Sequence, residues 1–412
     1  MAQTYKFGKD GQWATKKGST LAYSDTNNAF KPLPFSFERN SIGTRVNKEG
    51  LIEVVGNDIP RIDYTDSAEG ALLLENSATN LLTYSEDYST WNKVVSSNTN
   101  FSTVNPKGTT DTQKITQTSS GGYIEKARTF IGNETFSVFV KKDTSDFVRL
   151  YAAGNSVYFN IFKGTIETIS GSVQDKSIIN YGNGWFRISI TVNSTSSSYV
   201  RIYPSSSGSS TSGLNSLFVW GAMLESNSVA SSYIPTNGST VQRAAETCNE
   251  SGNSEVFNDS QGVLMAEISA LANDSYRYLS LSNGSNDNNV RFNLSPTANQ
   301  IGFEVTSGGS NQLNYTNNNT NVLLNTKVSI KYKENNFSIW INGFKLYTDL
   351  SGSTPIGLDR INFDRGTGGN VFNGKTKEID YYDTALTDAE LEKLTSYRSL
   401  NEMVTELNLN AL

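Results

Sequence analysis

The sequence has no histidine and only one cysteine, Cys248, among its 412 residues. Without histidine, the Ser-His-Asp and Cys-His nucleophile systems and every His-ligated metal site are excluded. A single cysteine permits neither an internal disulfide nor the ligand spacing of a zinc finger. Any catalysis would therefore have to rest on carboxylates, and we expect Cys248 to be a structural residue in a linker.

The sequence also lacks an excess of basic residues and long apolar runs. Lys and Arg number 34 against 40 Asp and Glu, which gives a formal net charge of −6. Surfaces that bind nucleic acid are basic, so we expect no DNA or RNA partner. No run approaches the length of a membrane span, and we expect no membrane insertion. Because the N-terminal MAQTYKFGKDG has no apolar core of signal-peptide length, we expect assembly in a cytoplasm.

Aromatic and small polar residues are plentiful instead. Hydrophobic residues make up only 36% of the chain, yet it holds 20 Tyr and 20 Phe. This balance is typical of thin two-sheet sandwiches, in which one face of each strand meets water. The length suggests two or three domains. We predict an all-β fold class: two antiparallel β-sandwich (jelly-roll) domains in tandem, a loop-rich N-terminal arm and a short C-terminal helical tail.

Turn residues and changes in composition give the predicted boundaries. The first segment is rich in Gly, Pro and Asn with scattered aromatic anchors, and we interpret it as an arm that orders by docking on another subunit or surface; a disordered tail is the alternative. A polar stretch separates the two strand-rich blocks. The predicted parts are an attachment arm (1–43), a β-rich collar (44–91), a first sandwich (92–235), a linker (236–256), a second sandwich (257–386) and a helical tail (387–412).

Apolar residues with a period of two mark strands in both blocks. In 185–192 every second residue is apolar, and the same pattern occurs on both sides of a Glu-Asn-Asn turn within 326–347. Asn342-Gly343, which ends the second of these runs, is a type I′ turn signal. Residues 326–347 are therefore predicted to form a three-stranded antiparallel meander.

The tail is the clearest helical pattern. Thr387 with Glu390 three residues later predicts a capping box, and apolar residues then recur at threes and fours over 388–412. This apolar stripe either packs on its own sandwich or forms a subunit contact. The contact candidates are Leu400, Met403, Val404 and Leu407.

Several runs mix short apolar pieces with turn residues: TRVN (44–47), GLIE (50–53), PRIDY (60–64) and TNLLTYSED (79–87). Further runs are TFSVFVK (135–141), GWFR (184–187), FVWGAMLE (218–225), ASSYIPT (230–236) and RAA (243–245). Together they resemble virion appendage proteins of tailed bacteriophages, in which such a segment precedes a jelly-roll, carbohydrate-binding-like domain. The ending KEIDYYDTALTDAEL (377–391) resembles concanavalin-like lectin/laminin-G sandwiches, in which the last strand runs into a short helix.

The resemblance implies a structural component of a bacteriophage virion. It suggests a fibre or receptor-binding subunit that displays glycan-binding sandwiches for host recognition, without enzymatic activity. A capsid decoration protein and a polysaccharide-degrading enzyme of the concanavalin-like class are the alternatives. The implied partners are a host cell-surface glycan, other virion proteins through residues 1–43, and further copies in a homotrimer. The implied location is the virion, assembled in the bacterial host cytoplasm.

Two groups of polar residues are candidates for chemistry. Concanavalin-like glucan hydrolases carry carboxylates at three alternate positions of one strand. Here these positions hold Glu378, Asp380 and Tyr382, so the third carboxylate is missing and a solvated strand face is expected. The loop 283–289 has amide oxygens that suit calcium, but only one carboxylate, and a plain solvated loop is the alternative. No cofactor, metal site or catalytic residue is predicted.

Glycan binding requires an aromatic platform beside amides or carboxylates, because sugar C–H faces stack on rings while hydroxyls need planar polar partners. The candidates are Trp340, Asn342, Tyr382, Tyr276 and Tyr278. Packing in the core is the alternative for each ring. Trp340, on the polar parity of its strand, is either covered by another element or open to a sugar.

Overall fold

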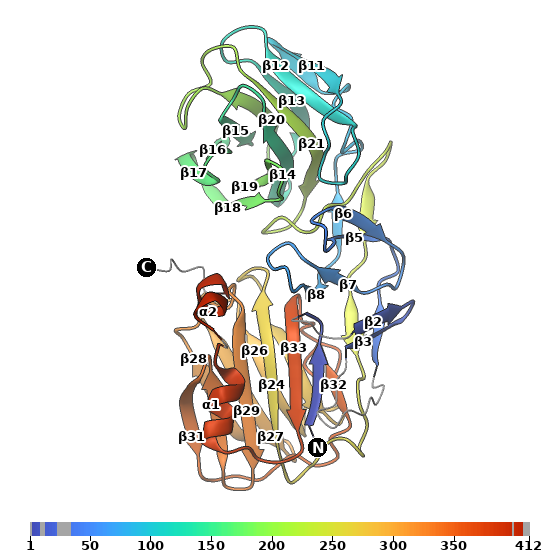
Figure 1. Cartoon of the computed structure of the whole chain (residues 1–412), viewed down its shortest axis with the longest axis vertical. Coiled ribbons are helices and arrows are strands. Elements are labelled where there is room, and N and C mark those ends of the chain that lie inside the picture. Colours follow the sequence, from blue (N-terminus) through green and yellow to red (C-terminus); the bar gives the residue numbers. More distant parts are fainter. Residues whose placement is uncertain (1, 9–12, 23–33, 398, 407–412) are drawn as a thin grey trace. The chain divides into compact units, whose positions relative to one another are not determined.

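The computed structural model describes residues 2–8, 13–22, 34–397 and 399–406. These residues form antiparallel sheets and two short helices near the C-terminus, which confirms the predicted all-β fold class (Figure 1). No helix in the described ranges has the length and apolar character that crossing a membrane requires.

The chain divides into two compact units whose boundaries differ from the predicted domains. Unit 1 comprises residues 1–40, 56–76 and 245–412, and unit 2 comprises 41–55 and 77–244. The predicted collar (44–91) and linker (236–256) are each shared between the units. Each unit is therefore assembled from segments that are far apart in the sequence.

Unit 1 contains a sandwich of two antiparallel sheets. The larger sheet has the order β31-β30-β29-β24-β33-β8-β7, with β1 also paired to β33 (Figure 1). Its strands are β1 (Ala2–Lys6), β7 (Arg61–Asp63), β8 (Ala71–Leu74), β24 (Gln261–Ala270), β29 (Thr326–Lys333), β30 (Phe337–Ile341), β31 (Phe344–Asp349) and β33 (Gly374–Tyr382).

The second sheet of unit 1 has the order β28-β27-β26-β25-β32. Its strands are β25 (Arg277–Ser282), β26 (Asn289–Leu294), β27 (Ile301–Ser307), β28 (Ser310–Asn317) and β32 (Arg360–Asn362). Residues such as Leu264 and Ile330 from one sheet and Phe292 and Phe303 from the other share a single buried core. A smaller sheet adds β2 (Trp13–Lys16), β3 (Ser19–Ala22), β4 (Phe35–Glu38) and β23 (Thr247–Asn249).

The described part of residues 1–43 is built into unit 1, whereas the sequence predicted an arm without a core. Tyr5 pairs with Ile379 across the β1–β33 ladder. Tyr5, Phe7, Phe35 and Phe37 are all fully buried in the core of unit 1. These aromatics looked isolated in the sequence because their packing partners come from strands near the C-terminus. Cys248 from the predicted linker is buried in the same core.

The predicted meander is confirmed by β29, β30 and β31, which pair in sequence order. Asn342 and Gly343 form its second turn with φ values of 49° and 86°. Both residues adopt positive φ, as a type I′ turn requires.

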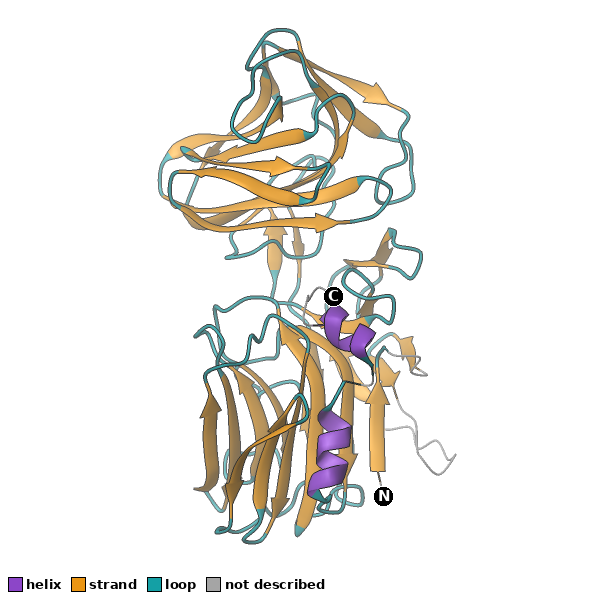
Figure 2. Cartoon of the chain, turned by 60° about the vertical axis from the view of Figure 1, so that its left-hand side comes forward, coloured by secondary structure: helices purple, strands orange, loops and turns teal. Residues whose placement is uncertain are grey.

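The tail forms two helices where one was predicted: α1 (Asp388–Thr395) and α2 (Leu400–Glu406). Thr387 and Glu390 make the predicted capping box. The hydroxyls of Thr395 and Ser396 bond to carbonyls one turn back, a local alternative to continued helix, and α1 ends there. Helix α1 contacts β29, β30 and β31 of its own unit (Figure 2).

Unit 2 contains a jelly-roll-like sandwich of two antiparallel sheets with the orders β10-β13-β20-β15-β16-β17 and β11-β12-β21-β14-β19-β18. The first sheet consists of β10 (Asn92–Val94), β13 (Tyr123–Thr129), β15 (Phe147–Ala152), β16 (Asn155–Asn160), β17 (Thr165–Ser170) and β20 (Ser197–Ser205). The second consists of β11 (Ser96–Phe101), β12 (Thr112–Gln117), β14 (Gly132–Lys142), β18 (Val173–Asn180), β19 (Trp185–Ser194) and β21 (Ser216–Glu225).

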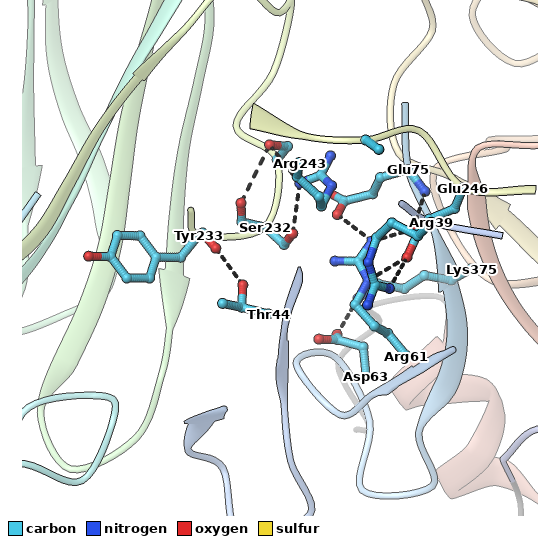
Figure 3. Close-up of polar contacts among 12 residues, drawn as sticks. Arg39, Thr44, Arg61, Asp63, Glu75, Ser232, Tyr233, Arg243, Glu246 and Lys375 are labelled. Carbon is cyan, nitrogen blue, oxygen red and sulfur yellow. Dashed lines mark hydrogen bonds and ion pairs between the residues drawn. The ribbon is translucent and has the colours of Figure 1, made fainter. Parts of the chain in front are cut away.

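Short strands and polar contacts join the remaining segments of unit 2. The pairs are β5 (Gly43–Val46) with β6 (Ile52–Val55) and β9 (Ala78–Asn80) with β22 (Val241–Arg243). Thr44 donates its hydroxyl to the carbonyl of Tyr233, and Arg243 donates to the hydroxyl of Ser232 at 2.9 Å (Figure 3). The Thr44 bond, together with the bond that the Ala244 N–H donates to the Ser41 hydroxyl at 2.9 Å, joins 41–55 to 77–244.

A buried ion network joins the three segments of unit 1 (Figure 3). Glu246 Oε1 accepts from Arg39 Nη1 at 2.7 Å and from Arg61 Nε at 2.8 Å. Arg61 Nη2 also lies 2.8 Å from Glu75 Oε2. Burial alone would lower the pKa of Arg61, but the ion pairs with Glu246 and Glu75 outweigh it and raise the pKa. Each charge is thus paired, as burial demands.

Candidate functional site

Trp340 belongs to the core and is not an open platform, which corrects its place among the glycan candidates. Its side chain is only 4% exposed and packs with Val263 and Leu391. Leu391 comes from α1, so the C-terminal helix covers the polar-parity face of the meander. Tyr382 is half-buried against the same cluster. Burial raises its pKa most, and the charges of nearby Asp380 and Glu378 raise that pKa further.

Asn342 closes a turn. Its side-chain oxygen accepts a hydrogen bond from the backbone N–H of Lys327 at 3.0 Å. Its own N–H donates to the Lys327 carbonyl at 2.9 Å. The side-chain oxygen and the backbone N–H of Asn342 are therefore both hydrogen-bonded within the fold.

Glu378 and Asp380 are both buried, whereas a solvated strand face was expected. They lie on β33, which is a central strand with β24 on one side and β1 and β8 on the other. Lys6 Nζ from β1 lies 3.4 Å from Glu378 Oε1. The sequence could not reveal this partner, because it is contributed by the opposite end of the chain.

The remaining two candidates, Tyr276 and Tyr278, adjoin the side of the second sheet of unit 1 that faces away from its core, and most residues on that side are buried. Residues at alternate positions of β25, β26 and β27, such as Leu279, Phe292 and Phe303, point into the core. The intervening residues must lie on the opposite side of the sheet. We call this side the polar face: Tyr278, Ser280 and Ser282 of β25, Asn289, Arg291 and Asn293 of β26, and Gly302, Glu304 and Thr306 of β27.

An arginine–carboxylate pair forms the centre of the polar face. Arg291 and Glu304 are direct cross-strand partners, and Arg291 Nε donates to Glu304 Oε2 at 2.8 Å. Asn293 Nδ2 lies 3.3 Å from the other Glu304 oxygen. The guanidinium of Arg291 also lies 5.4 Å from the centre of the Tyr278 ring. The polar groups are thus held in place before any ligand arrives.

Tyr276 supplies an accessible ring beside this cluster. It is 47% exposed, and its ring centre lies 6.4 Å from that of buried Tyr278. Burial, followed by the charge of Glu304, raises the pKa of Tyr278, so its hydroxyl stays protonated. The accessible part of this arrangement is the Tyr276 ring and the 17% exposed carboxylate of Glu304, whereas Arg291 and Asn293 are buried.

A glycine and a loop shape the polar face. A Cβ on Gly302 would lie 2.3 Å from the Asn293 amide nitrogen, so a glycine there gives the Asn293 side chain its room. The loop after β32 packs on the same face: a Cβ on Gly366 would lie 3.0 Å from the Ser282 hydroxyl, Arg365 is 5.7 Å from the Tyr278 ring, and the Arg365 carbonyl lies 3.4 Å from Arg291 Nη1. The Arg291 side chain is therefore fixed from two directions.

The loop 283–289 uses its amides within the fold. Asn288 Oδ1 accepts from the backbone N–H groups of Gly308 and Ile356, both at 3.1 Å. Asn289 Nδ2 donates to the carbonyl of Asn286 at 2.8 Å. Across the described residues, no group of three or more His, Cys, Asp or Glu side chains is arranged to hold a metal ion.

Sequence reasoning missed Arg291, Asn293 and Glu304. A usable signal was present, because Val290, Phe292 and Leu294 alternate with polar residues in 289–294. The same alternation does not predict that Arg291 pairs with Glu304, because that pairing depends on the register of the two strands. The six residues between β26 and β27 do not form a two-residue turn that would fix the register.

No protein-family model and no curated protein matches the chain. Among solved structures, the chain is similar to the CBM40 of *Ruminococcus gnavus* IT-sialidase bound to α2,3-sialyllactose. The identity is 18%, the match covers 36% of this chain and 94% of that chain, and the TM-score is 0.30. A leech intramolecular trans-sialidase matches at 19% identity over 34% of this chain and 24% of that chain, with a TM-score of 0.28. A SAP-like pentraxin from *Limulus polyphemus* matches at 11% identity over 34% and 71%, with a TM-score of 0.27. At these values the likeness assigns no ligand.

Proposed function

We propose that the protein is a non-enzymatic glycan-binding subunit of a bacteriophage virion, and that the polar face of unit 1 contacts the glycan. The observation that carries the binding proposal is the exposed ring of Tyr276 beside the fixed Arg291–Glu304 pair. The virion role rests on the sequence resemblance. Within that role, a tail fibre or receptor-binding subunit is preferred, and a capsid decoration protein is the alternative location.

The chemistry of the polar face suits a sugar better than an apolar or a purely ionic ligand. A sugar ring stacks its C–H face on Tyr276, while the partly exposed carboxylate of Glu304 accepts hydrogen bonds from its hydroxyls. Because Arg291 already holds Glu304 and Asn293 lies within reach of the same carboxylate, little side-chain entropy is lost on binding. Individual contacts of this kind are weak, and a virion would gain avidity from several copies.

The absence of enzymatic activity is part of the proposal. Its support is the burial of Glu378 and Asp380, the carboxylate pair that resembled the hydrolase pattern. Proposed partners are a host cell-surface glycan, other virion proteins through residues 1–43, and two further copies of the chain. The proposed location is the virion, assembled in the bacterial cytoplasm.

The test is binding of the full-length protein to an array of bacterial surface polysaccharides. Tyr276→Ala should weaken binding to the best array ligand by about 1 kcal/mol, roughly fivefold, because it removes one aromatic contact. Phe344→Ala is the control, since Phe344 is an aromatic on the other sheet that is 72% exposed, against 47% for Tyr276. Unchanged binding by Tyr276→Ala, or an equal loss in both variants, would contradict the proposed face.

A further inference from the structure

The outer surface of one sheet of unit 2 carries arginines packed among tyrosines. Val148, Leu150, Val200 and Ile202 of β15 and β20 point into the core of unit 2. The residues between them, among them Arg149 and Arg201, lie on the opposite side of the sheet. We call Arg149, Arg201 and the five tyrosines that contact them the Tyr-Arg face.

Arg201 is electrically balanced on this face. Its guanidinium carbon lies 4.6 Å from the ring centre of Tyr151, 4.8 Å from Tyr123 and 4.9 Å from Tyr199. Its Nε donates to Glu125 Oε2 at 2.7 Å. Glu125 therefore neutralises this arginine, and Arg201 with its tyrosines forms a fixed wall.

Arg149 has the same aromatic surroundings without a carboxylate. Its guanidinium carbon lies 4.8 Å from the ring centre of Tyr203 and 5.5 Å from that of Tyr158. Tyr203 and Tyr158 are its direct cross-strand partners. Its Nε is buried without a hydrogen-bond acceptor, and no ion pair to Arg149 occurs among the residues that the structure describes.

A guanidinium held between rings without a carboxylate partner is suited to an anionic acceptor. Buried polar groups are nearly always satisfied, and an orphaned donor at a surface indicates a missing partner. Stacking on tyrosine uses the flat face of the guanidinium and leaves its N–H groups for acceptors. A carboxylate fits that fork with two parallel hydrogen bonds. The partly exposed rings of Tyr151 and Tyr199 offer stacking surfaces to a sugar that carries the carboxylate, whereas Tyr203 and Tyr158 are buried.

We propose that the Tyr-Arg face of unit 2 is a second glycan site that binds uronic-acid-containing polysaccharide through Arg149. The partially exposed ring of Tyr199 extends the contact to a neighbouring sugar. This site lies in the other unit and uses different residues from the polar face of unit 1. It goes beyond the proposed function and stands or falls separately from it.

The test is calorimetric titration of the full-length protein with tetragalacturonate and with its methyl ester. The two probes share rings and hydroxyls, and the ester replaces each carboxylate with a neutral methyl ester. We expect tetragalacturonate to bind at least tenfold more tightly than the ester. Arg149→Gln should reduce tetragalacturonate affinity about tenfold or more, the scale of a lost charged hydrogen bond, and leave the ester unaffected.

Two controls keep the result interpretable. Lys48→Gln removes one positive charge from an exposed turn of the same unit and should leave binding unchanged. Tyr276→Ala, which addresses the polar face of unit 1, should also bind tetragalacturonate normally. Melting curves establish that Arg149→Gln is folded. Equal affinity for acid and ester, absence of binding, or an intact response in folded Arg149→Gln would each overturn the proposal.

Discussion

The position of a side chain on a strand decides what an aromatic residue does in this protein. Trp340 and Tyr276 both came from the sequence as aromatic candidates beside polar residues. The structure covers Trp340 with α1 and leaves nearly half of Tyr276 accessible. The alternation of apolar and polar residues predicts on which side of a strand each residue lies. It does not predict which side of the meander the C-terminal helix covers.

Trp340→Ala should therefore behave as a core truncation. We expect it to reduce the free energy of unfolding by about 3–5 kcal/mol, because the cavity left under α1 cannot close completely. Urea unfolding measures this change when it is monitored by a circular dichroism signal that does not depend on tryptophan. Phe344→Ala, at an exposed position of the same meander, should stay within about 0.5 kcal/mol of the parent. Unchanged stability together with loss of binding to the polysaccharide array would contradict a core position for Trp340 and indicate an exposed one.

The arginines of the polar face and of the Tyr-Arg face show what the sequence predicts for a single residue and what it does not predict. Alternation in 289–294 marks Arg291 as outward-facing, and the same reasoning applies to Arg149 in β15. Whether such an arginine is paired depends on its neighbours across the sheet. Arg291 meets Glu304, whereas Arg149 meets Tyr203 and Tyr158. Those registers join residues that no local pattern connects.

At the scale of elements, local signals were the most dependable. The meander followed from period-two alternation and an Asn-Gly turn, and the start of α1 followed from its capping box. The end of the helix was predicted wrongly: the apolar spacing continues past Ser396, but Ser396 has an extended backbone (φ −76°, ψ 156°) and α1 ends there. The apolar stripe is therefore divided between α1, which packs on its own sheet, and α2.

The subunit contact predicted for the tail can be tested on helix α2. Leu400 is 63% exposed, Met403 and Val404 are half-buried, and Leu407 lies outside the described residues. We predict a homotrimer in sedimentation equilibrium, and we expect Leu400→Glu to shift it toward monomer by placing a charge in an apolar contact. Leu350→Glu, at another strongly exposed leucine, should leave the mass unchanged. A monomeric parent protein at micromolar concentration would refute the trimer.

At the scale of the whole molecule, the sequence predicted two sandwiches but not their composition. The polar stretch 236–256 looked like a linker because it contains few apolar residues. It nevertheless holds Glu246 and Cys248, which are buried in unit 1. Unit 1 needs three segments of the chain, and the contacts among them are long-range pairs and one ion network. Such contacts leave no periodicity in the sequence.

Glu246→Gln tests how strongly that network holds unit 1 together. The change leaves two buried guanidinium groups with one carboxylate partner fewer, and we expect a loss of about 3–5 kcal/mol in the free energy of unfolding. Thermal and urea unfolding measure it. Glu255→Gln, at an exposed position nearby in sequence, should be close to neutral. A loss below about 1 kcal/mol would show that the segments are held by packing alone.

The pairing of β1 with β33 also sets an order of events on the ribosome. Tyr5 and Ile379 are ladder partners although roughly 370 residues separate them. At about 5–20 residues per second, the ribosome needs roughly 20–75 s to make β33 after it has made β1. All of unit 2 is synthesised within that interval. Throughout it, the aromatic side chains of Tyr5 and Phe7 have no native β33 to cover them, and nascent chains are exposed to premature association for that time.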